Sequence, residues 1–156
     1  EQKFPNILKS CNIFCGNKLL KNDYFIKLIL QMDIYNLRKN FLKVHTRKGF
    51  IDIIHNYGSI ILSHQQDNAL NYLYLEALYL GLPLLHNSEF IADYGYYYPD
   101  NDIDIALNNL NKIINYHSNN IENYRSKSSE ILEKFSYKNS SNKKEYQTLI
   151  NNLFHM

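Results

Sequence analysis

Up to Pro99, short apolar runs alternate along the chain with longer segments that have helical periodicity. Consecutive or alternating apolar and β-branched residues, bounded by turn-forming residues, are typical of strands, and fully apolar runs are typical of strands buried in parallel sheets. The pattern therefore predicts strands at Cys11–Cys15, Phe41–His45, Ser59–Ser63, Pro83–His86 and, more briefly, Tyr96–Tyr98.

Helical segments follow the earlier strands. Tyr24–Met32 is apolar nearly all round, which predicts a buried helix. Lys48–Asn56 and Leu70–Leu80 also have the helical period, and Gly58 and Gly81 are expected to end them, because glycine is common just after a helix.

Beyond Pro99 the pattern contains helices alone. Apolar residues recur at helical spacing over Ile103–Ile114, Ile121–Leu132 and Tyr146–Leu153, and the polar run Ser136–Lys144 predicts a loop. Strands that alternate with helices of about ten residues indicate βαβ units. We therefore predict an α/β fold: a Rossmann-like parallel sheet of about five strands with flanking helices and C-terminal helices.

The composition is that of a globular protein, with 45% hydrophobic and 21% charged residues, and 156 residues fit a single domain. The net charge is +2 and the 17 basic residues are spread along the chain, whereas a nucleic-acid binder usually has a dense basic patch. No apolar run reaches the roughly 18 residues of a membrane span. We expect a cytoplasmic protein that binds no nucleic acid and spans no membrane.

The N-terminus and the cysteines add two further expectations. The chain begins Glu-Gln-Lys-Phe-Pro, with neither an initiator Met nor an apolar signal segment, so we expect it to be a piece of a longer protein. Cys11 and Cys15 do not form a Cys-x-x-Cys motif and cannot make a disulfide framework. We interpret them as small apolar strand residues in a reducing compartment.

The candidate chemistry lies between Ser59 and Pro99. A polar loop, His64–Asn68, follows a predicted buried strand, and ligands of open parallel sheets bind at the carboxyl ends of strands. Glu76 lies in an otherwise apolar helix, where a carboxylate costs energy unless it is paired or reaches solvent. The spacing alone leaves open whether Glu76 binds a ligand, forms an internal ion pair or is simply exposed.

The segment Leu75–Leu85 resembles the Glu-Ala-x-x-x-Gly-x-Pro signature of retaining GT-B glycosyltransferases. More closely, the chain resembles an uncharacterised glycosyltransferase-like family known in bacteria and giant DNA viruses. This resemblance covers roughly 12–132 and rests on four further motifs: His64-Gln65, Asn71–Leu75, Pro83–Ser88 and Gly95–Pro99.

The resemblance implies that the chain is the C-terminal, donor-binding half of a two-domain GT-B enzyme. On this basis 1–156 is a single nucleotide-sugar-binding domain, the N-terminal acceptor domain is missing, and the fragment alone is inactive or weakly active. The substrate is a nucleotide-diphospho-sugar; no metal or cofactor is implied. If the source is viral, the expected compartment is the host cytoplasm. The catalytic residues, the donor sugar and base, the acceptor, the stereochemical outcome and the oligomeric state are not implied.

Several residues are candidates for the donor site. The resemblance implies that Glu76 binds the ribose hydroxyls and that a basic pair on the first βα loop neutralises the diphosphate. Lys18 and Lys21 can supply that pair, although the spacing alone favours solvated surface lysines. His64 and His86 follow consecutive predicted strands, so each either contacts donor phosphate or sugar or is a satisfied structural histidine. We expect four side chains to converge on one pocket: His64, Asn71, Glu76 and Ser88.

Two features differ from the glycosyltransferase signature. Many retaining GT-B enzymes have a second Glu eight residues before the ribose-binding one, and Asn68 stands there in this chain. Ala69-Leu70-Asn71 replaces the Gly-rich loop that faces the diphosphate. These differences keep a second interpretation open, a non-catalytic GT-B-like binding or scaffold module.

The remaining motifs argue against competing functions or have a structural interpretation. The dinucleotide fingerprint, the phosphate-binding P-loop and the Gly-x-Ser-x-Gly elbow are all missing from a chain with five glycines. Asp100, Asp102 and Asp104 resemble metal motifs, but Asp102-Ile103-Asp104 stands at the start of a predicted helix, where we favour capping. The tyrosines of Tyr94–Tyr98 are as well suited to packing as to stacking on a base or sugar.

Overall fold

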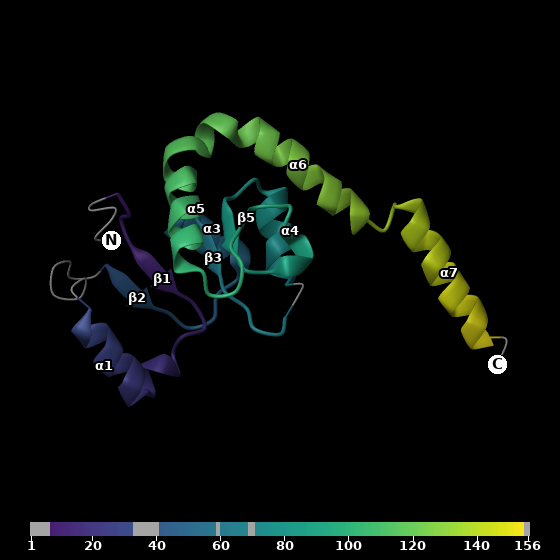
Figure 1. Cartoon of the computed structure of the whole chain (residues 1–156). Helices are drawn as coiled ribbons and strands as arrows, with labels where there is room; N and C mark the ends of the chain where they lie inside the picture. Colours follow the sequence, from purple (N-terminus) through teal and green to yellow (C-terminus); the bar gives the residue numbers. More distant parts are fainter. Residues whose placement is uncertain (1–6, 33–40, 59, 69–70, 155–156) are drawn as a thin grey trace. The chain divides into compact units, whose positions relative to one another are not determined.

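The computed structural model describes 7–32, 41–58, 60–68 and 71–154 of the chain. The chain divides into two compact units, Glu1–Gly58 (unit 1) and Ser59–Met156 (unit 2), each with its own parallel sheet (Figure 1). The prediction of an α/β protein with parallel strands is therefore confirmed. That the whole chain is one nucleotide-sugar-binding domain stays a prediction.

Unit 1 contains a two-stranded parallel sheet, with Cys11 opposite Leu42 and Ile13 opposite Val44. Beyond the paired residues, the Gly16 N–H donates to the His45 carbonyl oxygen at 3.0 Å and extends the contact of the two chain segments. The described elements of this unit are β1 (Cys11–Ile13), η1 (Leu19–Lys21), α1 (Asp23–Gln31), β2 (Leu42–Val44) and α3 (Phe50–Tyr57).

Two predictions about unit 1 are confirmed only in part. The helix over Tyr24–Met32 forms as α1, but it contains no buried residue, and Tyr24 is 76% exposed. A two-stranded sheet offers too little surface to cover a helix that is apolar nearly all round. The strand predicted for Cys11–Cys15 forms as β1 but ends at Ile13, and Cys15 has a left-handed backbone (φ 58°). Cys11 is a strand residue, as predicted, whereas Cys15 is not, and both are exposed free thiols.

Unit 2 contains a three-stranded parallel sheet in the order β3-β4-β5. In register, Ile61 lies opposite Leu84 and Leu85 lies opposite Tyr96. Helices α4, α5 and α6 gather around this sheet in Figure 1, with α4 beside α6 and α5 beside β5. The elements are β3 (Ile61–Ser63), α4 (Tyr72–Tyr79), β4 (Leu84–His86), η2 (Glu89–Ile91), β5 (Tyr96–Tyr97), α5 (Ile103–Tyr116), η3 (Ser118–Asn120), α6 (Ile121–Lys134) and α7 (Ser140–Phe154).

The prediction of about five strands in one sheet is wrong for the described residues, whose strands form one sheet of two and one of three. The predicted parallel pairing of Ser59–Ser63 with Pro83–His86 is confirmed by β3 and β4. Apolar periodicity indicates where strands lie but not which strands pair. The division of the chain at Gly58 therefore could not be seen in the pattern.

The core of unit 2 is built on β4, the central strand, whose residues are all buried. Leu85 packs with Tyr98 and with Ile113 of α5. Helix α4 contributes Tyr74 and Leu78, which are 0% and 1% exposed. A strand covered on both faces explains why its sequence is a continuous apolar run ending in a histidine.

The helix termini follow local capping chemistry. The Asp102 carboxylate accepts the Ile105 N–H at 2.9 Å and caps α5, which confirms the capping interpretation for this aspartate. The loop predicted for Ser136–Lys144 is wrong in its second half. Asn139 accepts the Ser141 N–H at 2.9 Å, and α7 begins at Ser140. Within the described ranges, no helix has the length and apolar character needed to cross a membrane.

Candidate functional site

The carboxyl ends of β3, β4 and β5 lie at one edge of the unit 2 sheet because the three strands are parallel. Hydrogen bonds join the loop after β3 to the loop after β4. The Gln65 N–H donates to the Asn87 side-chain oxygen at 2.8 Å, and the Asn87 side-chain amide donates to the Gln65 carbonyl oxygen at 2.8 Å. This reciprocal pair fixes the two loops against each other, so the edge is a preformed polar surface.

His64 lies on this edge and is held by Tyr98. The Nδ1 atom of His64 is 3.0 Å from the Tyr98 hydroxyl, and the two rings stack with centroids 5.9 Å apart. Burial raises the pKa of the Tyr98 phenol, so the hydroxyl keeps its proton and can donate it to Nδ1. When Tyr98 donates, the proton of a neutral His64 ring lies on Nε2. Because the residue is exposed, this N–H can donate to a ligand oxygen.

His86 is placed differently from His64. Its side chain is fully buried, Nε2 donates to the Tyr94 carbonyl oxygen at 2.7 Å, and Nδ1 accepts the Ser88 N–H at 3.2 Å. Burial lowers the pKa of the ring more than the bond to Tyr94 raises it, so the ring is neutral near pH 7. Both nitrogens are already satisfied by the chain. The geometry therefore favours the structural alternative for His86 over a contact with donor.

Ser88 follows His86 and is also buried, at 5% exposure. Its N–H closes a short turn onto the histidine ring. A buried side chain at this position is poorly placed to meet a ligand arriving from solvent. The expected convergence of Ser88 with the exposed residues His64 and Glu76 on one pocket stays a prediction.

Helix α4 begins beside the polar edge. Asn71 is its N-cap: the side-chain oxygen accepts the Leu73 N–H at 3.1 Å, so the side-chain NH₂ keeps its donors. The Tyr74 hydroxyl reaches back to the Ser63 hydroxyl at 3.1 Å and ties the helix to the end of β3. These contacts orient α4 relative to the strand that precedes it.

Glu76 belongs to the solvent face of α4. Tyr74, Ala77 and Leu78 point to the core, whereas Tyr72, Glu76 and Tyr79, spaced by four and three residues, are exposed. Among the described residues, no ion pair or hydrogen bond engages the Glu76 carboxylate. The sequence left three alternatives open for Glu76. The structure does not support an internal ion pair, and it supports a carboxylate that is available to a ligand or to water.

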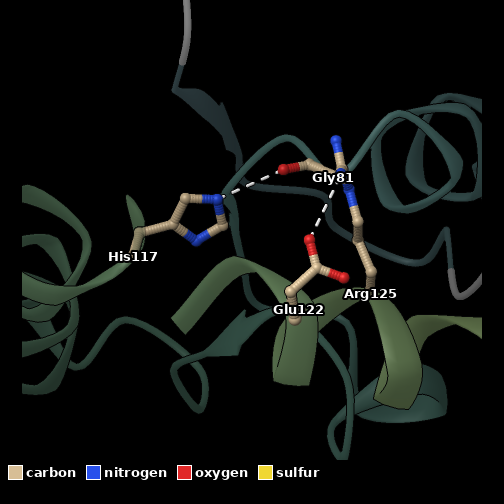
Figure 2. Close-up of polar contacts among 4 residues, drawn as sticks. All are labelled: Gly81, His117, Glu122 and Arg125. Carbon is tan, nitrogen blue, oxygen red and sulfur yellow. Dashed lines mark hydrogen bonds and ion pairs between the residues drawn. The ribbon is translucent and has the colours of Figure 1, made fainter. Parts of the chain in front are cut away.

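Residues at the junction of α5 and α6 contact the Gly-x-Pro turn that follows α4 (Figure 2). His117 Nε2 donates to the Gly81 carbonyl oxygen at 3.2 Å, and its Nδ1 accepts from the Tyr96 hydroxyl at 3.0 Å. Gly81 has φ +68°, a conformation that favours glycine. Arg125, which forms a 3.7 Å ion pair with Glu122, lies so close that a Cβ on Gly81 would be 2.7 Å from its Nε.

Tyr124 makes two further hydrogen bonds to this turn. Its hydroxyl donates to the Leu82 carbonyl oxygen at 2.9 Å and accepts the Leu84 N–H at 3.3 Å, at the point where β4 starts. Burial is the largest cause of the raised pKa of this phenol, which stays protonated. We call His117, Tyr124 and the turn Gly81–Leu84 the turn lock. The left-handed backbone of Gly81 gives the glycine of the motif a structural reason, whatever the ligand.

Lys18 and Lys21 lie in unit 1, at the start and end of η1, and both are exposed. Their predicted role at a diphosphate stays a prediction. Within the described parts of the chain, no group of three or more His, Cys, Asp or Glu side chains could hold a metal ion.

Sequence reasoning missed the residues that build the edge. Asn87 bridges two loops, and Tyr98 orients His64 from the far end of β5. An Asn directly after a predicted parallel strand is a signal for such a bridge, because its amide can both donate and accept. Nothing in the local sequence indicates the Tyr98 partner, since 34 positions separate it from His64.

The fold and this edge define an α/β protein with a preformed polar surface at the carboxyl ends of parallel strands. The model of a protein family described as "Protein of unknown function (DUF2827)" matches residues 2–150, nearly the whole chain. The chain therefore belongs to this family. No curated protein and no solved structure matches the chain.

Proposed function

We propose that the chain is the donor-binding domain of a GT-B-type glycosyltransferase and binds a nucleotide-diphospho-sugar at the carboxyl edge of the unit 2 sheet. The observation that carries the proposal is the state of Glu76. It is an exposed carboxylate, without an ion pair to any described residue, on a helix that starts at that polar edge. It stands in a Glu-Ala-x-x-x-Gly-x-Pro sequence resembling the ribose-binding signature of retaining GT-B enzymes.

The neighbouring residues have chemistry that suits a sugar nucleotide. Glu76 accepts hydrogen bonds from two ribose hydroxyls, and such charge-assisted bonds contribute about 1.5–3 kcal/mol each. His64 donates its Nε2 proton to a donor oxygen, with Tyr98 holding the other nitrogen. The side-chain NH₂ of Asn71 has no hydrogen-bond partner among the described residues and lies next to the N-terminus of α4, where partial positive charge favours phosphate.

Glycosyl transfer also requires an acceptor domain, which we propose is contributed by a further part of the protein. One observation favours the alternative of a non-catalytic binding module. Asn68 occupies the position of the second glutamate and donates to the Gln65 side-chain oxygen at 3.2 Å, so it serves the loop itself. A module of this kind retains the fold and has lost transfer activity.

Calorimetric titration with a panel of sugar nucleotides tests the proposal. Glu76→Gln keeps the shape of the side chain and removes its charge, so we expect donor affinity to fall by roughly tenfold to a hundredfold. The midpoint of thermal unfolding should barely change, because no described residue loses a charged partner. Glu130→Gln is the matched control: it neutralises an exposed carboxylate on α6 and should leave affinity unchanged.

Three outcomes are informative. Loss of affinity in Glu76→Gln alone supports the donor site. An equal affinity of Glu76→Gln and the native chain contradicts the role of Glu76. Absence of binding and of any donor-dependent rise in melting temperature across the panel contradicts donor binding itself and supports a scaffold module.

A further inference from the structure

A recess in unit 2 lies away from the proposed donor edge. It is a cavity of about 150 Å³ between the turn that precedes β5 and one face of α6. Because the turn residues Asp93–Gly95 come before Tyr96, the first residue of β5, the cavity lies at the amino end of this strand. His64 and Tyr98 belong to the opposite, carboxyl edge.

The α6 side of the cavity is polar: Asn123 and Lys127 are exposed at its rim, and Ser128 is buried. The residues that line it recur at helical spacing and are Asn120, Asn123, Tyr124, Lys127 and Ser128. Here amides, an ammonium group and a hydroxyl face the recess, so the surface is suited to hydrogen bonding.

Ser128 is the residue that points most clearly to a ligand. It is 2% exposed, and among the residues that the structure describes, no hydrogen bond engages its hydroxyl. The adjacent Ser129 behaves in the ordinary way and donates to the Ser126 carbonyl oxygen at 2.6 Å. A buried hydroxyl with no partner is destabilising, so it needs an explanation. A ligand with a donor and an acceptor supplies one.

The opposite wall is rigid. Gly95 has φ +66°, and a Cβ there would be 2.9 Å from the Leu84 carbonyl oxygen. The Tyr94 carbonyl is held by buried His86 at 2.7 Å. The Tyr96 and Tyr124 rings stack with centroids 5.7 Å apart. The Tyr96 hydroxyl is already bonded to His117, and the Tyr124 hydroxyl to the Leu82 carbonyl oxygen. Both tyrosines line the recess, and these contacts fix the positions of their rings.

The chemistry of these walls selects the ligand. Asp93 and Lys127, both exposed, have opposite charges, so the recess favours no net charge. At about 30 Å³ for each water, its volume corresponds to about five waters, which suits a molecule with one small ring. A sugar ring combines hydroxyls, which both donate and accept, with apolar C–H faces that pack on aromatic rings.

We propose that this cavity is a second, independent site that binds one neutral monosaccharide unit, with Ser128 as its buried hydrogen-bonding group. In a protein that acts on saccharides, such a site would anchor a chain at a distance from the proposed donor edge. The site does not depend on donor binding, because it shares none of the residues assigned to the donor.

Titration of the ¹⁵N-labelled full chain with glucose, galactose, mannose and N-acetylglucosamine, followed by amide chemical shifts, tests the proposal. We expect at least one sugar to shift the Gly95, Lys127 and Ser128 amides. Ser128→Ala should reduce the affinity roughly three- to tenfold, the effect of losing one net hydrogen bond. Its unfolding midpoint should stay the same or rise, because the lost hydroxyl has no partner among the described residues of the free protein.

The controls distinguish binding in the cavity from binding at the donor edge and from a general effect of substitution in α6. Ser129→Ala removes a neighbouring hydroxyl outside the cavity and should bind sugar normally, as should Glu76→Gln, which alters only the proposed donor site. Lys127→Gln, at an exposed position, should also weaken binding and serves as a second variant if Ser128→Ala fails to fold. Alanine and glycine, as free amino acids, test for a zwitterion site.

Four results would overturn the proposal. They are the absence of shifts at the cavity with every sugar, shifts confined to the carboxyl edge, unaltered affinity in both cavity variants, and stronger binding of the amino acids than of any sugar.

Discussion

Gly81 provides the most direct test of how the turn lock works. Replacing it with alanine has two consequences: a residue with a side chain must adopt φ +68°, and its Cβ must share space with Arg125. A left-handed backbone costs roughly 1–2 kcal/mol for an L-residue. The steric part depends on whether the neighbour can move.

The contacts indicate that Arg125 can move. The new Cβ would lie 2.7 Å from Nε and 3.3 Å from Cγ, but the arginine side chain is 55% exposed and its 3.7 Å pair with Glu122 is on the surface. Surface pairs of this kind contribute about 0–1 kcal/mol. We therefore expect Gly81→Ala to lower the free energy of unfolding by about 1–2 kcal/mol, mainly through the backbone.

Two other glycines calibrate this expectation. Gly58 has an extended backbone and open space around it, so Gly58→Ala should change stability by no more than about 0.5 kcal/mol. Gly95 combines φ +66° with a backbone oxygen 2.9 Å from the new Cβ, and a backbone atom cannot move aside cheaply. Gly95→Ala should therefore cost more than Gly81→Ala.

Urea unfolding followed both by circular dichroism and by tyrosine fluorescence measures these differences, provided that the two transitions coincide. Repeating Gly81→Ala in an Arg125→Ala background separates the two terms. We expect the cost of Gly81→Ala to change by less than about 0.5 kcal/mol. If the cost disappeared in that background, steric conflict rather than backbone conformation would be the cause, and the reasoning would be refuted.

The remaining predictions concern the tyrosine of the lock and the buried histidines. Tyr124→Phe leaves the Leu84 N–H and the Leu82 carbonyl oxygen without their partner, so unfolding by urea should show a loss of about 1–3 kcal/mol, whereas Tyr116→Phe at an exposed site should be neutral. Burial lowers the pKa values of His86 and His117 in the folded chain below the ordinary value of 6.5, so below about that pH the unfolded state binds more protons. Thermal melts should therefore show full stability above about pH 6.5 and a progressive loss as the pH falls, and a melting temperature that rises on acidification would contradict this assignment.

The sequence predicted the parts of unit 2 that depend on local chemistry. The β4 run Leu84–His86 is apolar because both faces are covered, and Gly81 ends α4 because the turn needs a left-handed residue. These requirements are local, so they leave a local signal. Capping by Asp102 left one for the same reason.

What the sequence could not predict depends on residues that are far apart. Periodicity could not tell whether His86 faces a ligand or a carbonyl, because its partner Tyr94 comes from a turn that the pattern does not define. Tertiary contacts also decide how the strands pair into two sheets. They decide as well that His64 meets Tyr98, 34 positions away. The apolar residues of α1 predicted burial, but whether another surface covers a helix is also decided by tertiary contacts that periodicity does not show.

The Leu84 amide has an unusual partner for the first residue of a central strand. Its proton is held by the Tyr124 hydroxyl of α6. Exchange of this proton with deuterium in solvent therefore requires α6 to separate from the start of β4. Exchange at amides held between strands requires the sheet itself to open. Leu84 thus reports on the docking of a single helix onto the start of β4. A ligand that strengthens the packing of α4 against α6 would slow exchange of the Leu84 amide first.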